Sequence, residues 1–232
     1  MKASLIFFLF SLLAYAQSMS INTPYRGELY DEVKPFMIEL FKRNHYDLSY
    51  QKQPLKRGLI NANKGIDDGD GPRVKAVGKK FKNIIRVDVP ILEISIHAFF
   101  KNKAMKIDSW EDIKPFTVGV RTGTVIQINH VKKADPKEIV YVPTNEKLFE
   151  LLEDNKLDII IAERVMAREI QRKMHLTHLQ ESPALLKKKM YLFLNKKHKD
   201  KIDNFKNTLI QMKEEGYQKR LKQFYDTGQS QR

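Results

Sequence analysis

The stretch FTVGVRTGTV, residues 116–125, predicts a buried strand that turns sharply into a helix. Residues 116–121 form the strand, Thr122-Gly123-Thr124 supplies the tight turn, and residues 125–131 begin the helix. The stretch LDIIIAER, residues 157–164, repeats the pattern with an apolar strand and a charged helix at 164–173. Strand-helix units of this kind predict parallel sheets, which bind ligands at the carboxyl ends of their strands.

The same alternation extends outward from these two stretches. The pattern predicts strands at 20–23, 48–50, 84–87, 91–100, 139–142 and 190–194. Helices are predicted over 29–41 with a kink or a late start at Pro35, between Pro54 and Gly65, from Ser109 as a short helix, from Thr144, over 202–212 up to Gly216, and at the C-terminus. The predicted fold class is therefore α/β, with one or two doubly wound sheets covered by helices on both faces.

The composition indicates a globular protein with a basic surface. Of the 232 residues, 42% are hydrophobic and 30% are charged, and the 42 basic residues exceed the 28 acidic ones by 14. Such a charge could attract a nucleic acid or peptidoglycan, and a steep loss of affinity with salt would reveal that binding mode. Because Lys and Arg are scattered among acidic residues, we expect a solvated basic exterior and no nucleic-acid partner. We also expect a monomer.

The first eighteen residues predict a cleaved signal peptide. Lys2 precedes an apolar run from Leu5 to Leu13, and Ala14-Tyr15-Ala16 has the small-x-small pattern of a cleavage site. The run is shorter than the roughly twenty residues that a membrane-spanning helix needs, although an uncleaved anchor is the alternative. With no cysteine, the chain has no disulfide and no thiol chemistry. We therefore expect a periplasmic protein that touches a membrane only peripherally.

Several motifs that suggest chemistry fail on their spacing. An EF-hand placed over Asp67–Gly71 would need ligands at Ile66 and Val77, so a solvated turn is the expected structure there. His175 and His178 lack a third ligand at motif spacing, and His97, in an apolar strand, is expected to be a satisfied core residue. The sequence has no nucleophile elbow, phosphate loop or dinucleotide fingerprint. We therefore expect neither an enzyme nor a bound metal or cofactor.

A few residues suit the binding of a small charged molecule. The turn from Thr122 to Thr124 precedes a helix whose free N–H groups attract an anion, although an ordinary capped turn is the alternative. Arg73 could hold a carboxylate with two hydrogen bonds, and Glu163, at a strand end, could accept a cation or ammonium. Tyr25 could stack on the ligand. A solvated Arg73, a Glu163 that merely caps a helix and a Tyr25 that covers its lobe are the structural alternatives.

The motifs together resemble those of the family 3 bacterial extracellular solute-binding proteins, the amino-acid-binding components of ABC importers. They span nearly the whole chain after residue 18, in this order: Gly27-x-Leu29, PLKR at 54–57, GIDDG at 65–69, Pro90, SWEDIK at 109–114, VGVRTGT at 118–124 and LDIII at 157–161. The resemblance implies a two-lobed periplasmic-binding-protein fold of type II that closes around its ligand, joined by two hinge strands near 94–100 and 190–194. Residues 19–94 and 190–232 would form the first lobe, and 95–189 the second.

The resemblance also implies roles for the candidate residues. Arg73 matches the family's carboxylate-binding arginine, Thr124 its hydroxyl residue at a helix N-terminus, and Tyr25 its ligand-packing aromatic residue. Glu163 stands where members that bind α-amino acids carry an aspartate, and the loop before Arg73 is short and Asp-Gly-rich. The expected function is capture of an amino acid or related carboxylate for an ABC permease or membrane sensor. The alternative is a periplasmic enzyme similar to cyclohexadienyl dehydratase, with Glu163 as its acid or base.

Overall fold

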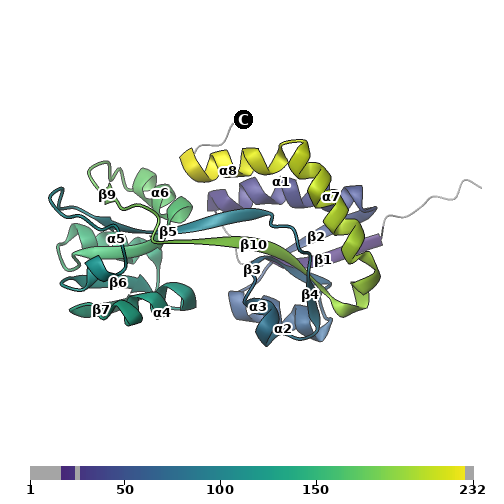
Figure 1. The fold of residues 1–232 in the computed structure, drawn as a ribbon, viewed down its shortest axis with the longest axis horizontal. Helices are drawn as coiled ribbons and strands as arrows, with labels where there is room; N and C mark the ends of the chain where they lie inside the picture. Colours follow the sequence, from purple (N-terminus) through teal and green to yellow (C-terminus); the bar gives the residue numbers. More distant parts are fainter. Residues whose placement is uncertain (1–16, 24–26, 228–232) are drawn as a thin grey trace, which may run out of the picture.

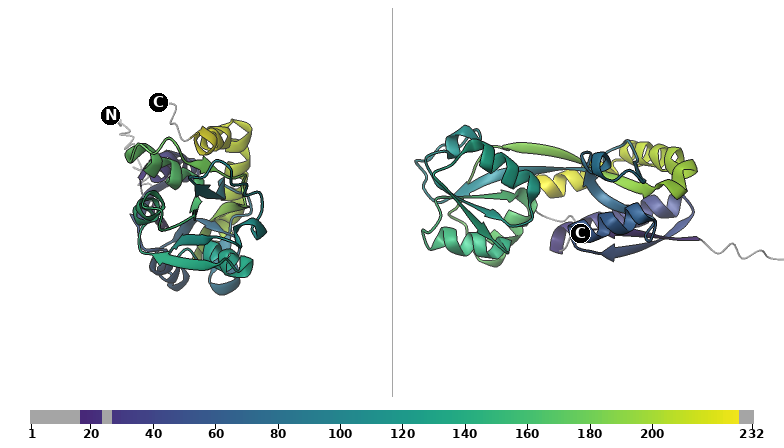
Figure 2. Two further views of the ribbon diagram at one scale, coloured as in Figure 1. Left: turned by 90° about the vertical axis from the view of Figure 1, so that its left-hand side faces the viewer. Right: turned by 90° about the horizontal axis from the view of Figure 1, so that it is seen from below.

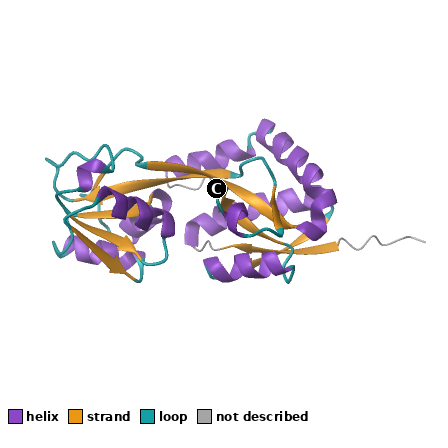
Figure 3. Cartoon of the chain, turned by 60° about the horizontal axis from the view of Figure 1, so that its bottom comes forward, coloured by secondary structure: helices purple, strands orange, loops and turns teal. Residues whose placement is uncertain are grey.

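The chain folds into two lobes joined by two long strands (Figure 1). The structure is a computed structural model that describes residues 17–23 and 27–227. Figures 1 and 3 show strands β5 (Leu92–Phe100) and β10 (Leu186–Asn195) running from one lobe into the other. The predicted two-lobed α/β fold with two hinge strands is confirmed.

The first lobe contains both ends of the described chain. Its strands are β1 (Gln17–Thr23), β2 (Tyr46–Lys52), β3 (Gly69–Val74) and β4 (Ile84–Arg86). Its helices are α1 (Gly27–Arg43), α2 (Leu55–Lys64), α3 (Val77–Lys80), the 3-10 segment Lys196–Lys201, α7 (Ile202–Glu214) and α8 (Tyr217–Thr227).

The second lobe is formed by the middle of the chain. Its strands are β6 (Thr117–Arg121), β7 (Glu138–Val142), β8 (Ile159–Glu163) and the short β9 (Gln180–Glu181). Its helices are the 3-10 turn Glu111–Ile113, α4 (Val125–Ala134), α5 (Asn145–Glu153) and α6 (Arg164–Lys173). The predicted lobe boundaries at 94/95 and 189/190 fall inside β5 and β10 and stay a prediction.

One hydrogen-bonded sheet connects the lobes in the strand order β2-β1-β3-β10-β5-β8-β6-β7. The strands β1, β2 and β3 pair in parallel, as do β6, β7 and β8, which agrees with the predicted doubly wound pattern. The crossing strands are antiparallel to one another, with Leu92–Ile96 paired to Leu186–Met190. The sheet is therefore mixed, and its two parallel ends meet through an antiparallel ribbon.

Each lobe has its own hydrophobic core. In the first lobe, α1 buries Leu29, Val33 and Phe36, and its Phe41 packs against Phe205 of α7 with ring centroids 4.8 Å apart. The helix continues through Pro35, which is exposed on the opposite face. Burial of the apolar face offsets the loss of one backbone hydrogen bond at the proline.

Two of the helix ends have the capping residue that the sequence predicts. Gly65 ends α2 in the left-handed conformation with φ of 76°, and the Thr144 side chain accepts the Lys147 N–H at the start of α5. After residue 109 the short helix that was predicted forms as the 3-10 turn Glu111–Ile113, but the predicted cap was wrong, because the Asp112 carboxylate accepts the Ser109 N–H at 2.8 Å. Ser109 therefore donates hydrogen bonds to Asp112 and does not accept one from a helix N–H.

The predicted turn at 67–71 was also wrong, because Gly69–Val74 forms β3 in the middle of the first lobe. Its partners are β1 and β10, both distant in sequence, so the pairing depends on tertiary contacts that local propensity does not report. Cβ atoms are poorly tolerated here, since one at Gly69 would lie 2.3 Å from the Phe193 carbonyl oxygen.

The lobes also touch where α1 begins. Arg172 of α6 forms an ion pair with Glu28, and the Glu28 N–H donates to the Glu169 carboxylate at 3.3 Å. The right-hand view of Figure 2 shows the two lobes from below, with β5 and β10 as the bridge between them. The α1–α6 contact is thus a second connection, made by two helices rather than by the sheet.

No helix in the described part of the chain has the length and apolar character to cross a bilayer. The predicted signal peptide falls almost entirely outside the described residues. A boundary at residue 18 would remove the first two residues of β1, whereas cleavage after Ala16 would leave that strand whole.

Candidate functional site

The predicted carboxylate-binding group, Arg73, lies inside the first lobe with 2% of its surface exposed. Its guanidinium forms an ion pair with Asp70 through Nε, and Nη2 donates to Asp70 Oδ2 at 2.9 Å and to the Leu55 carbonyl at 3.2 Å. Burial raises the pKa of Asp70, and the hydrogen bond from Arg73 opposes that rise. The two-pronged contact predicted for a ligand is therefore made with a carboxylate of the chain itself.

A bulge in β3 brings Asp70 and Arg73 together. Residues three apart on a regular strand point to opposite faces. Between Tyr191 and Phe193 the register with β10 shifts, so that two steps on β10 span the three steps from Arg73 to Asp70. The extra residue turns both side chains to the same face. Gly58 of α2 lies against the pair, since a Cβ there would be 2.6 Å from Asp70 Oδ2.

The turn from Thr122 to Thr124 leads into α4 as predicted, but its hydroxyl does not cap the helix. Thr124 Oγ1 donates to the Arg121 carbonyl at 2.6 Å, and no side chain caps α4. Thr122 is exposed, and its N–H donates to the Val142 carbonyl at 2.8 Å. The Val125 N–H donates to the Gly123 carbonyl at 3.0 Å. The first turn of α4 has no side-chain cap, so the N–H groups of Ile126 and Gln127 are the ones left for an anion.

Glu163 ends β8 and caps α6. It is 9% exposed, and its Oε1 accepts the Val165 N–H at 3.1 Å. Burial raises the pKa of Glu163 to about 7, against the lowering effect of hydrogen bonds from the Val165 and Met166 backbone and from Tyr225. Its carboxyl group therefore serves the helix end, which is the structural alternative stated for this residue, and near neutral pH it is only partly ionised.

Tyr25, the remaining predicted ligand contact, lies outside the described residues. Of the other four predicted site residues, Arg73 and Glu163 are buried and engaged with the chain, whereas Thr122 and Thr124 stand at an accessible helix start. The structure does not join Arg73 and Thr124 through any contact.

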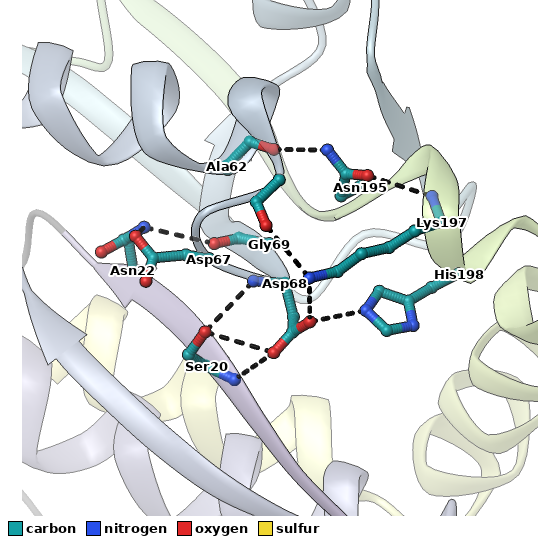
Figure 4. Close-up of polar contacts among 10 residues, drawn as sticks. Ser20, Asn22, Ala62, Asp67, Asp68, Gly69, Asn195, Lys197 and His198 are labelled. Atoms are coloured by element: carbon teal, nitrogen blue, oxygen red, sulfur yellow. Dashed lines mark hydrogen bonds and ion pairs between the residues drawn. The ribbon is translucent and has the colours of Figure 1, made fainter.

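The acidic turn before β3 is an anchor rather than a solvated loop (Figure 4). Asp68 accepts the Ser20 N–H at 2.8 Å and pairs with Lys197 at 2.8 Å and His198 at 2.7 Å. Although desolvation raises the pKa of Asp68, hydrogen bonds from Lys197, the Ser20 backbone and His198 hold it at about 2. Within 17–23 and 27–227, no group of three or more acidic or histidine side chains could hold a metal.

Two of the three candidate histidines, His97 and His178, have side-chain partners within the chain. His97 is 4% exposed, and its ring nitrogens contact the Ser182 carbonyl at 2.8 Å and Ser95 Oγ at 2.9 Å, as predicted for a satisfied core histidine. Burial lowers the pKa of His97, and the Ser182 carbonyl and Glu181 oppose that effect. His178 contacts Glu153 at 3.0 Å.

Sequence reasoning missed two cavities beside the crossing strands. The first, of about 720 Å³, lies against α8, and its charged lining comes from Arg164, Lys187, Lys189, Lys222, Glu93 and Glu181. We call it the α8 cavity. Arg164 Nε contacts Glu181 Oε1 at 2.6 Å there, so its charges are partly paired within the chain. The three consecutive lysines at 187–189 were the sequence signal that could have pointed to these cavities.

The second cavity, of about 740 Å³, lies between the lobes and is called the α4 cavity. Three parts of the chain line it: the end of β3 with α3, the helix α4, and the crossing strands. The lining residues are Val74, Lys75, Ala76, Lys79, Glu93, Ile126, Asn129, His130, Lys187, Lys188, Lys189 and Tyr191. Because Ile126 belongs to the first turn of α4, the uncapped helix start borders this cavity.

Comparisons with known proteins agree on the fold. No protein-family model matches the chain. An uncharacterized protein of Shewanella oneidensis is 23% identical over 189 residues, which cover 77% of this chain and 69% of that protein.

Three solved structures share the two-lobed architecture. The probable amino-acid ABC transporter extracellular-binding protein YtmK of Bacillus subtilis has a TM-score of 0.75 and 19% identity, over 89% of this chain and 96% of its own. The GluR0 ligand-binding core with L-glutamate has a TM-score of 0.73 and 12% identity, over 91% and 97%. The ancestral amino-acid-binding protein AncCDT-1, a precursor of cyclohexadienyl dehydratase, has a TM-score of 0.68 and 16% identity, over 90% and 94%. The chain is therefore similar in fold to extracellular amino-acid-binding proteins, with two lobes joined by two crossing strands.

Proposed function

We propose that the chain is a solute-binding protein that encloses a small polar ligand, an amino acid or a related carboxylate, between its two lobes. One observation carries this proposal: the α4 cavity is lined jointly by the first lobe, the second lobe and the crossing strands. A ligand that touches all three contributes more contacts when the lobes are closed than when they are open. That difference is what drives closure on binding.

The start of α4 is the half-site that best fits a ligand carboxylate. Its N–H groups have no side-chain cap, and the helix dipole favours negative charge there. Arg73 lines neither of the two cavities, and its Nε and Nη2 are bound to Asp70 and to the Leu55 carbonyl, so we assign the first contact to α4 rather than to Arg73. As proposed partners, an ABC permease or a membrane sensor would recognise the closed form in the periplasm.

A matched pair of substitutions tests this assignment. Thr124→Asp places a carboxylate at the uncapped start of α4, where it would occupy the free N–H groups and repel an anionic ligand. Thr144→Asp makes the same change at the start of α5, outside both cavities. In a thermal-shift and calorimetry screen of amino acids and small carboxylates, we expect Thr124→Asp alone to weaken binding, by about tenfold or more.

Two results would contradict the proposal. One is the absence of any shift in melting temperature across the screen, since a ligand at one hundred times its Kd stabilises by about 2.7 kcal/mol. The other is an equal loss of binding in both variants, which would show that the start of α4 has no special part in recognition.

An enzyme on the same scaffold is the second candidate, favoured by the pKa of about 7 at Glu163. A buried carboxyl group that titrates near neutral pH suits proton transfer. Its Oε1, however, faces the Val165 N–H. Incubation with prephenate, followed by detection of product, tests this candidate. Turnover that disappears in Glu163→Gln would favour the enzyme, and absence of turnover would exclude this substrate.

A further inference from the structure

The α4 cavity carries an unusual excess of positive charge. Five lysines line it, namely Lys75, Lys79, Lys187, Lys188 and Lys189, against the single carboxylate of Glu93. Within the described ranges, none of these five lysines forms an ion pair or hydrogen bond with another side chain. Glu93 lies across the ribbon from Lys189, whereas Lys187 and Lys188 face Ser95 and Ile94. The excess charge is therefore not neutralised inside the chain.

The crossing strand β10 supplies three of these charges in succession. Side chains of neighbouring residues on a strand point to opposite faces, so Lys188 lies on the face opposite Lys187 and Lys189. Lys187 and Lys189 also line the α8 cavity, so Lys188 is the lysine of the ribbon that belongs to the α4 cavity alone. Burial lowers the pKa of His130, and Lys188 and Lys133 lower it further. Lys188 thus lies close enough to α4 for its charge to lower the pKa of His130, which belongs to the second lobe. The charge of Lys188 and that of α4 therefore act on the same cavity, whereas Lys187 and Lys189 are shared with the α8 cavity.

The first lobe adds Lys75, which follows the end of β3, and Lys79, which lies in the short α3. The second lobe lines the cavity with Ile126, Asn129 and His130 of α4, and the uncapped first turn of that helix contributes the positive end of its dipole. A neutral zwitterion would leave most of these like charges facing one another. A guest with several negative charges would offset their repulsion from both lobes at once.

We infer that the cleft takes a small molecule with two or more negative charges, such as a di- or tricarboxylate or a phosphate ester, rather than a neutral α-amino acid. This inference rests on the proposed function and specifies the ligand class of the same cleft. Val74, Ile126 and Tyr191 line the rest of the cavity and would contact the carbon skeleton of such a ligand.

Citrate and inorganic phosphate are suitable probes, with alanine as the zwitterionic comparison, all titrated by calorimetry at one fixed ionic strength. The test variant is Lys75→Gln with Lys188→Gln, which removes one charge from the first lobe and one from the ribbon. The control is Lys206→Gln with Lys213→Gln, two exposed positions on α7. We expect the test variant to weaken citrate binding by about tenfold or more and the control by less than about twofold.

A second measurement tests whether the ligand binds beside Lys188 and His130. Bound citrate would counteract the charge of Lys188, so the pKa of His130, followed by proton NMR, should rise when the protein is saturated. An unchanged His130 would overturn the inference, as would equal citrate affinity in the two double variants or tighter binding of alanine than of citrate. Binding to anionic lipid vesicles without binding of citrate would also overturn it, because the lysines would then recognise a surface.

The outcomes separate this inference from the proposed function. If alanine or another amino acid binds and the Lys75/Lys188 variant is indifferent, only the ligand class is wrong. If neither amino acids nor anions bind the wild-type protein, solute capture itself is refuted.

Discussion

Replacement of Glu163 by Gln should change how the stability of the protein depends on pH. The unfolded chain loses the Glu163 proton near its ordinary pKa of 4.5, whereas burial keeps that proton on the folded chain up to about 7. Between these values folding takes up a proton, so the free energy of unfolding falls as pH rises. The fall ends once pH exceeds the folded-state pKa. Glu163→Gln cannot ionise, yet it keeps an oxygen that can accept the Val165 N–H.

The magnitude follows from the shift. At 1.36 kcal/mol per pKa unit, a rise from 4.5 to about 7 corresponds to a loss of about 3 kcal/mol of stability in the wild type between about pH 4 and about pH 8. Glu163→Gln should lack this loss. Groups that do not interact with Glu163 titrate equally in both proteins and cancel in the difference between them.

Urea unfolding at several pH values measures the difference directly. The matched control is Glu214→Gln, the same substitution at an exposed position of α7. We expect the free energies of wild type and Glu163→Gln to diverge by about 3 kcal/mol across the range, and those of wild type and Glu214→Gln to stay parallel. Parallel curves for wild type and Glu163→Gln would refute the reasoning, because they would show that burial does not raise this pKa.

Three further substitutions test other features of the fold. Gly69→Ala would place a Cβ 2.3 Å from the Phe193 carbonyl oxygen and should destabilise by about 2–4 kcal/mol in urea unfolding, whereas Gly78→Ala, with a 3.4 Å contact, should cost far less. Asp68→Asn should lose about 1–2 kcal/mol at neutral pH; since the folded-state pKa is about 2, the wild type should lose this stability as pH falls from about 4 to about 2, and a deficit that persists at lower pH would contradict the assignment. Thr144→Ala should lower the melting temperature by removing the acceptor for the Lys147 N–H, at a cost of about 1 kcal/mol, and an unchanged melting temperature would show that the cap contributes nothing.

The sequence was most informative where the structure depends on residues that are adjacent in the chain. Thr144 caps α5 and Gly65 ends α2 because both roles need only a few adjacent backbone groups. The apolar strand of β8 was also predictable, since burial on both faces requires an unbroken apolar run.

The sequence was least informative around β3. Asp-Gly repeats have low strand propensity, and β3 forms because β1 and β10 pair with its two edges. Those partners also set the bulge that turns Arg73 toward Asp70. The family resemblance supplied a role for Arg73 but not the partner that occupies it. The sequence shows Asp70 three residues before Arg73. On a regular strand, residues three apart point to opposite faces, so this spacing did not predict the ion pair.

The contact between α1 and α6 gives a direct way to follow opening of the lobes. Glu28 and Arg172 stand on different lobes, and their side chains are 39% and 41% exposed. The chain contains no cysteine of its own. Glu28→Cys and Arg172→Cys would therefore accept a pair of fluorophores at two defined points, and energy transfer between the dyes would report separation of the lobes molecule by molecule.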